Sequence, residues 1–181
     1  MAWRCGGWLL LACVVSPVVA QAATPACAVW QRELSFARSV QQHDAAAFAG
    51  YLMADAIFDA NAPQPTRGRA AILQHWSAMI AGKSVRLDWY PQQVVTSSDG
   101  KLAYSSGPYL FENLAAGAKR RYTIGRFATT WRHATDGAWR VAFDAGDHGK
   151  AASEAEAAAF RAARVELCPG NSVAELPVIR H

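Results

Sequence analysis

The spacing of apolar residues predicts a helix near the start of the chain. From residue 28 to residue 42, apolar side chains recur three or four positions apart, at Trp30, Leu34, Ala37 and Val40. A helix with ~3.6 residues per turn brings these positions onto one face, which can be buried against the rest of the protein. We therefore expect this helix to form part of the core.

Two further helices and a short strand are predicted before residue 83. Asp44 can cap a short helix that continues to about Leu52, because its side chain can accept a backbone N–H of the first turn. Residues 56–58 are expected to form a strand. A third helix should begin near Gly68 and end at Gly82, because glycine adopts the left-handed conformation without strain.

The apolar period changes to that of strands beyond residue 84. Glycine-containing turn signals separate successive runs that are rich in β-branched and aromatic residues. Consecutive strands joined by tight turns form an antiparallel meander, and runs longer than the usual ~5–6 residues make such a sheet twist and curl. The runs cover residues 85–96, 101–113, 121–133 and 138–144.

The chain is expected to end in one more helix and a flexible tail. Ser153 and Glu156 form a capping-box pattern at the start of a helix that should continue to Leu167. Residues 169–181 show no period. Helices followed by a curled antiparallel sheet predict an α+β fold in which the sheet wraps the helices, in a single domain at residues 23–168.

Residues 1–22 have the pattern of a secretory signal peptide. Arg4 precedes an apolar run over residues 8–20, and residues 20–22 supply the small side chains that a signal peptidase recognises. The run is shorter than the ~20 residues of a membrane-spanning helix. We therefore expect an exported protein, periplasmic or secreted, with no membrane association after cleavage. Lipidation at Cys13 is the alternative.

Removal of this leader leaves two cysteines, Cys27 and Cys168. In an oxidising compartment such a pair usually forms a disulfide. Closing so long a loop could add about 4–5 kcal/mol of stability in the chain-entropy model. A metal site is disfavoured, because the chain has no Cys-x-x-Cys pattern and no cluster of His residues.

Charge and known motifs exclude several classes of function. The chain carries 18 Lys and Arg residues against 14 Asp and Glu residues, a formal net charge of +4. The basic residues form short clusters beside predicted turns and strand ends, whereas a nucleic-acid groove needs a longer stripe with exposed aromatic side chains. We therefore expect no nucleic-acid partner. We also expect no cofactor, because phosphate-binding loops and the motifs of serine hydrolases and zinc proteases are missing from the sequence.

The segment from Asp59 to Trp76, DANAPQPTRGRAAILQHW, carries a family resemblance. It resembles the catalytic segment of the ketosteroid-isomerase branch of NTF2-like proteins, in which a strand ends in an Asp, a Pro-containing loop follows, and a Gly opens a helix that reads Ala-Ala-Ile. Residues 30–148 as a whole resemble DUF4440 or SnoaL-like members of that superfamily. The resemblance implies a cone in which N-terminal helices pack in a curled antiparallel sheet, a cavity at its open end, and a homodimer that pairs through the sheet.

The resemblance also suggests Asp59 as a general base. In the isomerase branch a Tyr and a protonated Asp stabilise the oxygen anion, but the corresponding positions here are Phe36 and either Phe127 or Thr129. None of these supplies an acidic donor, and each missing oxyanion donor typically costs about 2.7–4 kcal/mol. Steroid isomerisation by that mechanism is therefore not expected. Asp59 could instead have a structural role, capping its loop or pairing with a nearby Arg.

The resemblance further predicts a cavity with an aromatic lining. Asp144, Asp147 and His148 could in principle hold a metal ion, but a solvated loop is the favoured interpretation because no further matched ligand is evident. The residues expected to contact a ligand are Trp76, Trp89, Tyr104, Tyr109, Phe127, Trp131 and Asp144.

Three functions follow from these patterns. The leading hypothesis is an exported, disulfide-closed domain that binds a small, largely apolar molecule in its cone, as a homodimer. The second is a cofactor-independent isomerase, cyclase or hydratase with Asp59 as the base. The third is an assembly module without a pocket, which would use the outer face of the sheet.

Overall fold

The structure, a computed structural model, describes residues 24–169. The predicted signal peptide, the alternative lipidation site at Cys13 and all but the first residue of the predicted tail lie outside the described residues. The helices and strands are α1 (Pro25–Gln41), α2 (Ala45–Gly50), β1 (Leu52–Phe58), β2 (Thr66–Arg67), α3 (Arg69–Ala81), β3 (Val85–Trp89), β4 (Gln93–Thr96), β5 (Leu102–Asn113), β6 (Tyr122–His133), β7 (Trp139–Gly146), β8 (Lys150–Ala152) and α4 (Glu154–Ala162).

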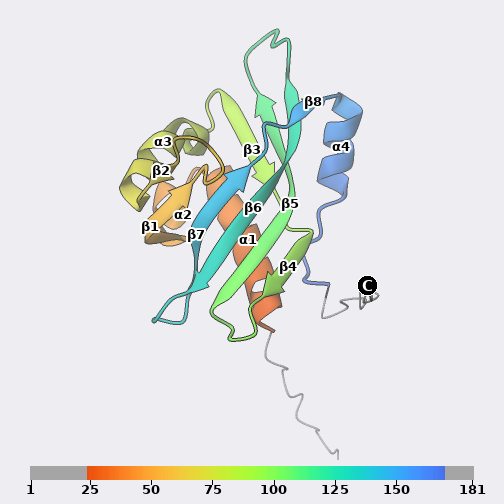
Figure 1. Cartoon of the computed structure of the whole chain (residues 1–181). Coiled ribbons are helices and arrows are strands. Elements are labelled where there is room, and N and C mark those ends of the chain that lie inside the picture. The colour runs from red at the N-terminus through yellow and green to blue at the C-terminus, as the bar shows by residue number, and fades with distance from the viewer. Residues whose placement is uncertain (1–23, 170–181) are drawn as a thin grey trace, which may run out of the picture.

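A single curled sheet organises the fold, and the predicted α+β cone is confirmed (Figure 1). The strands follow the order β2-β1-β7-β6-β5-β3, with β4 also paired to β5 and β8 also paired to β6. All pairs are antiparallel except β1 with β7, which run parallel. The chain runs from β1 to β7 through α3 and strands β3 to β6, and so long a connection allows the two strands to lie parallel, which a tight turn would not.

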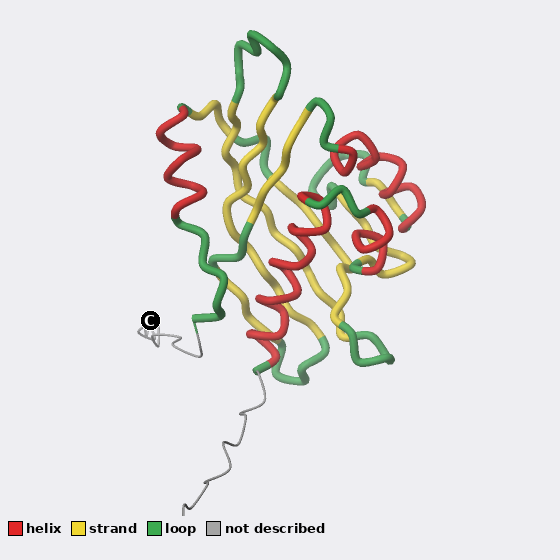
Figure 2. The backbone as a smooth tube through the Cα atoms, turned by 180° about the vertical axis from the view of Figure 1, so that it is seen from behind, coloured by secondary structure: helices red, strands yellow, loops and turns green. Residues whose placement is uncertain are grey.

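Helices α1, α2 and α3 lie against the inner face of this sheet, and α4 lies beside them at the sheet edge, packed on Leu110 of β5 and Tyr122 of β6. Figure 2 shows α1 across the middle of that face, with α2 and α3 on one flank and α4 on the other. Helix α1 contributes to two apolar clusters: Val29 and Phe36 pack with α2, α3 and the sheet, whereas Trp30 and Leu34 pack with α4. Burial of both flanks of α1 explains why its apolar stripe is broad.

The capping signals read from the sequence are present in the structure. Asp44 accepts the backbone N–H of Ala47 at 2.8 Å, and Ser153 and Glu156 form the reciprocal capping box. Gly82 ends α3 with a φ of 63°, in the left-handed region. These features are local in sequence, so local pattern is enough to find them.

Several predicted element lengths are wrong. Helix α2 ends at Gly50, and Leu52, predicted to lie in it, begins β1, which is longer than the predicted strand 56–58. The run 85–96 is split into β3 and β4, because Pro91 has no N–H to donate and the chain bends there to follow β5. At this bend the backbone crosses Gly107 so closely that a Cβ there would lie 2.0 Å from the carbonyl oxygen of Tyr90. The last helix ends at Ala162 rather than Leu167, and Leu167 is 79% exposed.

A disulfide joins the two ends of the described chain. Cys27 in the first turn of α1 is bonded to Cys168, which follows α4, across a sequence separation of 141 residues. The bridge holds the segment after α4 against α1, and the ring of Phe160 on α4 lies 4.8 Å from that of Tyr90. None of the helices in residues 24–169 is long and apolar enough to cross a membrane.

Candidate functional site

A cavity of about 400 Å³ opens between α1, α3, the loop after β1 and the inner face of the sheet. Its size is within the range of small-molecule sites. Apolar and aromatic side chains make up most of the wall, and polar groups gather where β1 and β7 end. The lining residues are Phe36, Asp59, Asn61, Ala62, Pro63, Trp76, Met79, Leu87, Trp89, Tyr109, Phe111, Phe127, Asp144, Ala145, Gly146, Asp147 and His148.

Most, but not all, of the residues predicted from the sequence lie in this cavity. Asp59, Trp76, Trp89, Tyr109, Phe127 and Asp144 line it. Tyr104 does not, because the alternation of β5 directs it to the outer face, where it is 41% exposed. Trp131 points inward but lies beneath the cavity wall, where it is fully buried. The sequence analysis missed the lining residues Leu87 and Phe111.

Asp59 sits in a loop that is fastened to the end of β7. Its own φ is 54°, a left-handed conformation that is uncommon for a residue with a side chain. The N–H of Ala60 donates to the carbonyl oxygen of Asp144 at 3.0 Å, and the side-chain amide of Asn61 donates to that of Gly146 at 3.0 Å. These bonds hold the strained turn, so that the Asp59 side chain faces the cavity.

The side chain that lies beside the Asp59 carboxylate is a histidine rather than an arginine. Nε2 of His75 on α3 lies 3.8 Å from Oδ2 of Asp59, and both side chains are about half exposed. Arg69 instead donates to the carbonyl oxygen of Leu52 at 2.6 Å. The Asp59 carboxylate is therefore open to the cavity, with one titratable neighbour at its mouth.

Asp144 provides an acidic group on the inner face of the sheet. It is the cross-strand partner of Thr129, whose hydroxyl donates to Oδ2 of Asp144 at 2.8 Å. Loss of hydration within the protein raises the pKa of this carboxyl to about 8; the bond from Thr129 opposes the shift, and the charges of Glu33 and Asp59 add to it. Near neutral pH Asp144 is therefore mainly protonated and can donate a hydrogen bond into the cavity.

Asp144 supplies an acidic hydrogen-bond donor near the position where the sequence lacks one. Thr129 occupies one of the two positions where the isomerase branch carries its sheet Asp, and it has no acidic proton. The carboxyl is found on the neighbouring strand, directly across from Thr129. Aligning β6 alone does not reveal that Asp144 lies beside Thr129, because the pairing register of β6 with β7 brings the two side chains together.

A buried acid, Glu33, lies behind the aromatic wall. Its carboxylate accepts the indole N–H of Trp89 at 2.7 Å, the indole N–H of Trp131 at 3.0 Å and the hydroxyl of Ser105. Burial raises the pKa of Glu33, and these donors oppose that shift. The sequence does contain a signal for it, since residue 33 lies three positions after Trp30 on the apolar face of the first helix, where a charged residue needs partners.

Asp147 fixes a turn at the rim of the cavity. One carboxylate oxygen accepts the backbone N–H groups of Arg126 and Gly149, each at 3.0 Å, and its carbonyl oxygen accepts the hydroxyl of Tyr109 at 2.9 Å. These bonds hold the strand end that carries Asp144. In the part of the chain that the structure describes, no group of three His, Cys, Asp or Glu residues is placed to hold a metal ion.

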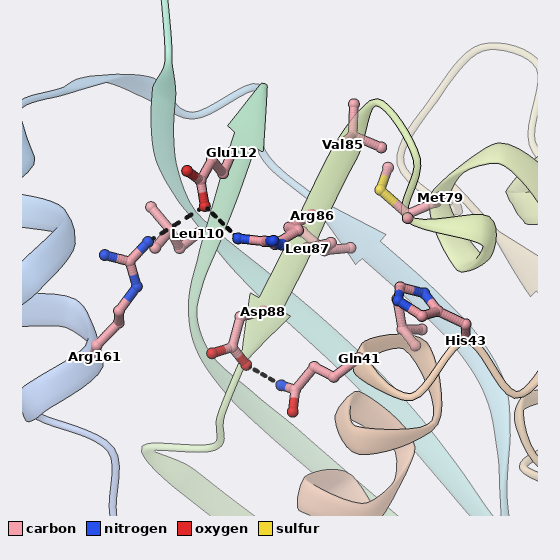
Figure 3. A pocket seen from close by; sticks show the side chains of 12 residues that line it. Gln41, His43, Met79, Val85, Arg86, Leu87, Asp88, Leu110, Glu112 and Arg161 are labelled. Atoms are coloured by element: carbon pink, nitrogen blue, oxygen red, sulfur yellow. Dashed lines mark hydrogen bonds and ion pairs between the residues drawn. The ribbon is translucent and has the colours of Figure 1, made fainter. Parts of the chain in front are cut away.

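A smaller cavity of about 190 Å³ lies on the other side of Met79 and Leu87 (Figure 3). The carboxylate of Glu112 is held there by Arg86 at 3.7 Å and by Arg161 at 3.5 Å. Its charged groups thus pair with one another across β3, β5 and α4. The larger cavity combines more space with polar groups open to a ligand, and we take it as the candidate site.

The family comparison agrees with this geometry. The SnoaL-like domain family matches residues 34–142, more than half of the 181-residue chain. The chain belongs to this family. No curated protein sequence matches the chain.

Solved structures show where the fold recurs. A ketosteroid isomerase-like protein from Erwinia carotovora atroseptica superposes with a TM-score of 0.53 at 12% identity, covering 67% of this chain and 93% of that one. An NTF2-like protein of unknown function from Pseudomonas putida gives 0.54 at 16% identity, covering 70% and 92%. An NTF2-like superfamily protein from Salmonella enterica serovar Typhimurium gives 0.54 at 13% identity, covering 71% and 93%. At these identities the likeness establishes the fold alone.

The raised pKa of Asp144 predicts how stability depends on pH. An Asp of the unfolded chain titrates near pH ~3.9, whereas Asp144 in the folded protein has a pKa of about 8. Between these values only the folded state holds the proton, so the free energy of unfolding should fall as pH rises and level off above pH ~8. Asp144→Asn should remove this part of the slope and stabilise the protein at pH ~8 by about 1–4 kcal/mol, allowing for solvent in the cavity.

Urea unfolding of the native protein and of Asp144→Asn between pH ~4 and ~9 measures how the free energy of unfolding depends on pH. Glu33 contributes a slope of the same sign to both proteins, so the difference between them reports Asp144 together with its electrostatic coupling to Glu33. Asp55→Asn is the matched control, because the Asp55 side chain is 69% exposed. Parallel curves for the native protein and Asp144→Asn would show that Asp144 titrates normally.

Proposed function

We propose that this protein is exported and binds a small, largely apolar molecule in the aromatic cavity. The observation that carries the proposal is the cavity itself: about 400 Å³ of space with aromatic walls, and polar groups confined to one end. Sites of this kind bury most of a ligand in apolar contact and use a few polar groups to orient it. The disulfide between Cys27 and Cys168 is compatible with export.

Packing and hydrogen bonds hold two aromatic side chains of the cavity wall, Trp76 and Trp89, in fixed positions. The ring of Trp76 stacks on Phe48 at 5.3 Å between centroids and meets Phe58 edge-on at 5.3 Å. Trp89 is fixed by its bond to the buried Glu33. Side chains held in place before a ligand arrives lose little conformational entropy on binding, which favours affinity.

A second candidate function is acid–base catalysis in the same cavity. It is favoured by the pairing of Asp59, which is open to the cavity, with Asp144, whose pKa of about 8 keeps it protonated near neutral pH. One carboxylate that removes a proton and one acid that donates a hydrogen bond to an oxygen are the groups that isomerases, cyclases and hydratases require. The reaction would be proton transfer next to a carbonyl group, without a cofactor.

We further propose that two copies of the chain pair through the outer face of the sheet. Val95, Tyr104 and Phe143 are 48%, 41% and 43% exposed, and they form one row across β4, β5 and β7, with Thr130 of β6 between the last two. Leu102, 47% exposed, extends the row along β5. Exposed apolar side chains gathered in one patch mark an interaction site, and a two-fold pairing of the patch with itself covers it.

Replacement of a cavity aromatic should weaken binding, whereas replacement of an outer aromatic should not. Trp76→Ala should reduce affinity for the neutral apolar dye Nile red by about tenfold or more, because a large contact surface is lost. Tyr104→Ala is the matched control and should bind as the native protein does. Fluorescence titration of the exported protein measures both. Equal affinities for all three proteins would contradict binding in this cavity.

The catalytic candidate predicts exchange of acidic C–H protons. The protein should accelerate hydrogen–deuterium exchange next to the carbonyl of benzylacetone in D₂O, as followed by NMR. Asp59→Asn should slow the protein-dependent exchange by about 10²-fold or more, because the base is lost, and should leave dye binding in place. If the native protein does not accelerate exchange, the catalytic candidate is wrong and the binding proposal is unaffected.

The proposed pairing predicts a change of mass in solution. The native protein should sediment as a dimer, and Phe143→Lys should sediment as a monomer, because charges are then opposed at the centre of the interface. Arg126→Lys, a conservative change at the cavity end of β6, should remain dimeric. A native protein that sediments as a monomer at high micromolar concentration would refute the pairing.

A further inference from the structure

The charge of the cavity differs from the charge of the chain. The protein is basic, with a formal net charge of +4. No Lys or Arg from residues 24–169 is among the residues that line the cavity, whereas Asp59, Asp144 and Asp147 are. The basic side chains near this lining, among residues 24–169, are His148 on its wall and His75 at its mouth, 3.8 Å from Asp59. The concave lining thus gathers acidic groups in a partly desolvated space, where a charge acts more strongly than on the surface.

The rest of the lining is suited to a positive charge as well. Six aromatic rings face the cavity, from Phe36, Trp76, Trp89, Tyr109, Phe111 and Phe127. The face of an aromatic ring attracts a cation, most strongly for Trp and most strongly when water is excluded. An anion, by contrast, would be repelled by ionised carboxylates in this lining.

We propose that the ligand of this cavity is an organic cation, an amine that is protonated or quaternary and carried on a compact apolar body. This inference rests on the proposed binding function and names the class of its ligand. The apolar body would lie among the aromatic rings. The ammonium group would lie at the polar end, between Asp59 and Asp144, where the strained turn and the end of β7 hold the carboxyl groups together.

Binding of a cation should be linked to ionisation of Asp144. The groups that face this carboxyl are Glu33 from α1, Thr129 from β6 and Asp59 from the loop after β1, with Asp147 and His148 at the following strand end. Two of these acids already disfavour a negative charge on Asp144. An ammonium group beside it would reverse that balance, so the ligand should displace the proton from Asp144.

The competing occupant is a neutral molecule with a carbonyl or hydroxyl oxygen. Such a ligand would keep the proton on Asp144 and accept a hydrogen bond from it. A cationic ligand should therefore release the proton of Asp144, whereas a neutral ligand should retain it. One set of probes that differ only in charge can distinguish the two classes of ligand.

The test uses three compounds that share one rigid apolar cage: adamantylamine, adamantanol and adamantanecarboxylate. Calorimetric titration of the exported, disulfide-bonded protein at pH ~8 should show the amine binding about tenfold or more tighter than the alcohol, with the carboxylate weakest. Affinity for the amine should rise by up to about tenfold per pH unit from pH ~6 to ~8 and then level off, and about one proton should be released per ligand near pH ~7. Affinity for the alcohol should not rise.

Asp144→Asn should abolish both the rise with pH and the proton release, and should lower the preference for amine over alcohol. A pH dependence that persists in this variant would come from groups other than Asp144 and would overturn its role. Asp59→Asn is a second variant that should lower the same preference. Asp55→Asn removes a carboxylate on the outer surface and should bind all three compounds as the native protein does.

The outcomes separate this inference from the proposed function. If the alcohol binds as tightly as the amine, or the carboxylate binds tightest, the cavity is not selective for cations and only the present inference fails. If none of the three compounds and no Nile red binds, the proposed function fails and the inference fails with it.

Discussion

The position of α1 in the curled sheet depends on one buried carboxyl group. Glu33 is fully buried, and its carboxylate accepts hydrogen bonds from side chains of β3, β5 and β6. A buried acid is stabilised only if its hydrogen-bond partners are in place, so α1 can enter the sheet at one depth and one rotation. Apolar contacts alone would permit the helix to slide or turn by small amounts, because such contacts are not directional.

The location of the cavity follows from that placement. Helix α1 fills the middle of the concave face, and α4 packs beside it at the sheet edge, with Phe160 against Tyr90. On the other flank α2 and α3 cover only part of the face, which leaves space above Phe36 and Trp89. The cavity is therefore the part of the concave face that the helices do not cover, and its polar end is where β1 and β7 stop.

Sequence patterns predicted the parts of this arrangement that are encoded locally. The caps at Asp44, Ser153 and Gly82 depend on residues within one turn, and each is present. The general location of the cavity, with Asp59 and Trp76 on its wall, came from a contiguous segment. The features that sequence patterns missed depend on contacts between distant residues. The outward direction of Tyr104 could be predicted only if the inner face of β5 were known. The proximity of Asp144 to Thr129 could be predicted only from the register of β6 with β7.

The disulfide gives the folded chain the connectivity of a ring. Cys27 and Cys168 close all but a few of the described residues into one covalent loop. A single cut in an exposed turn, such as the one between β5 and β6, would leave both fragments joined to each other. The cut fragments would stay at a high effective concentration and could hold the native packing. A single proteolytic cut between the two cysteines would thus release no part of the chain.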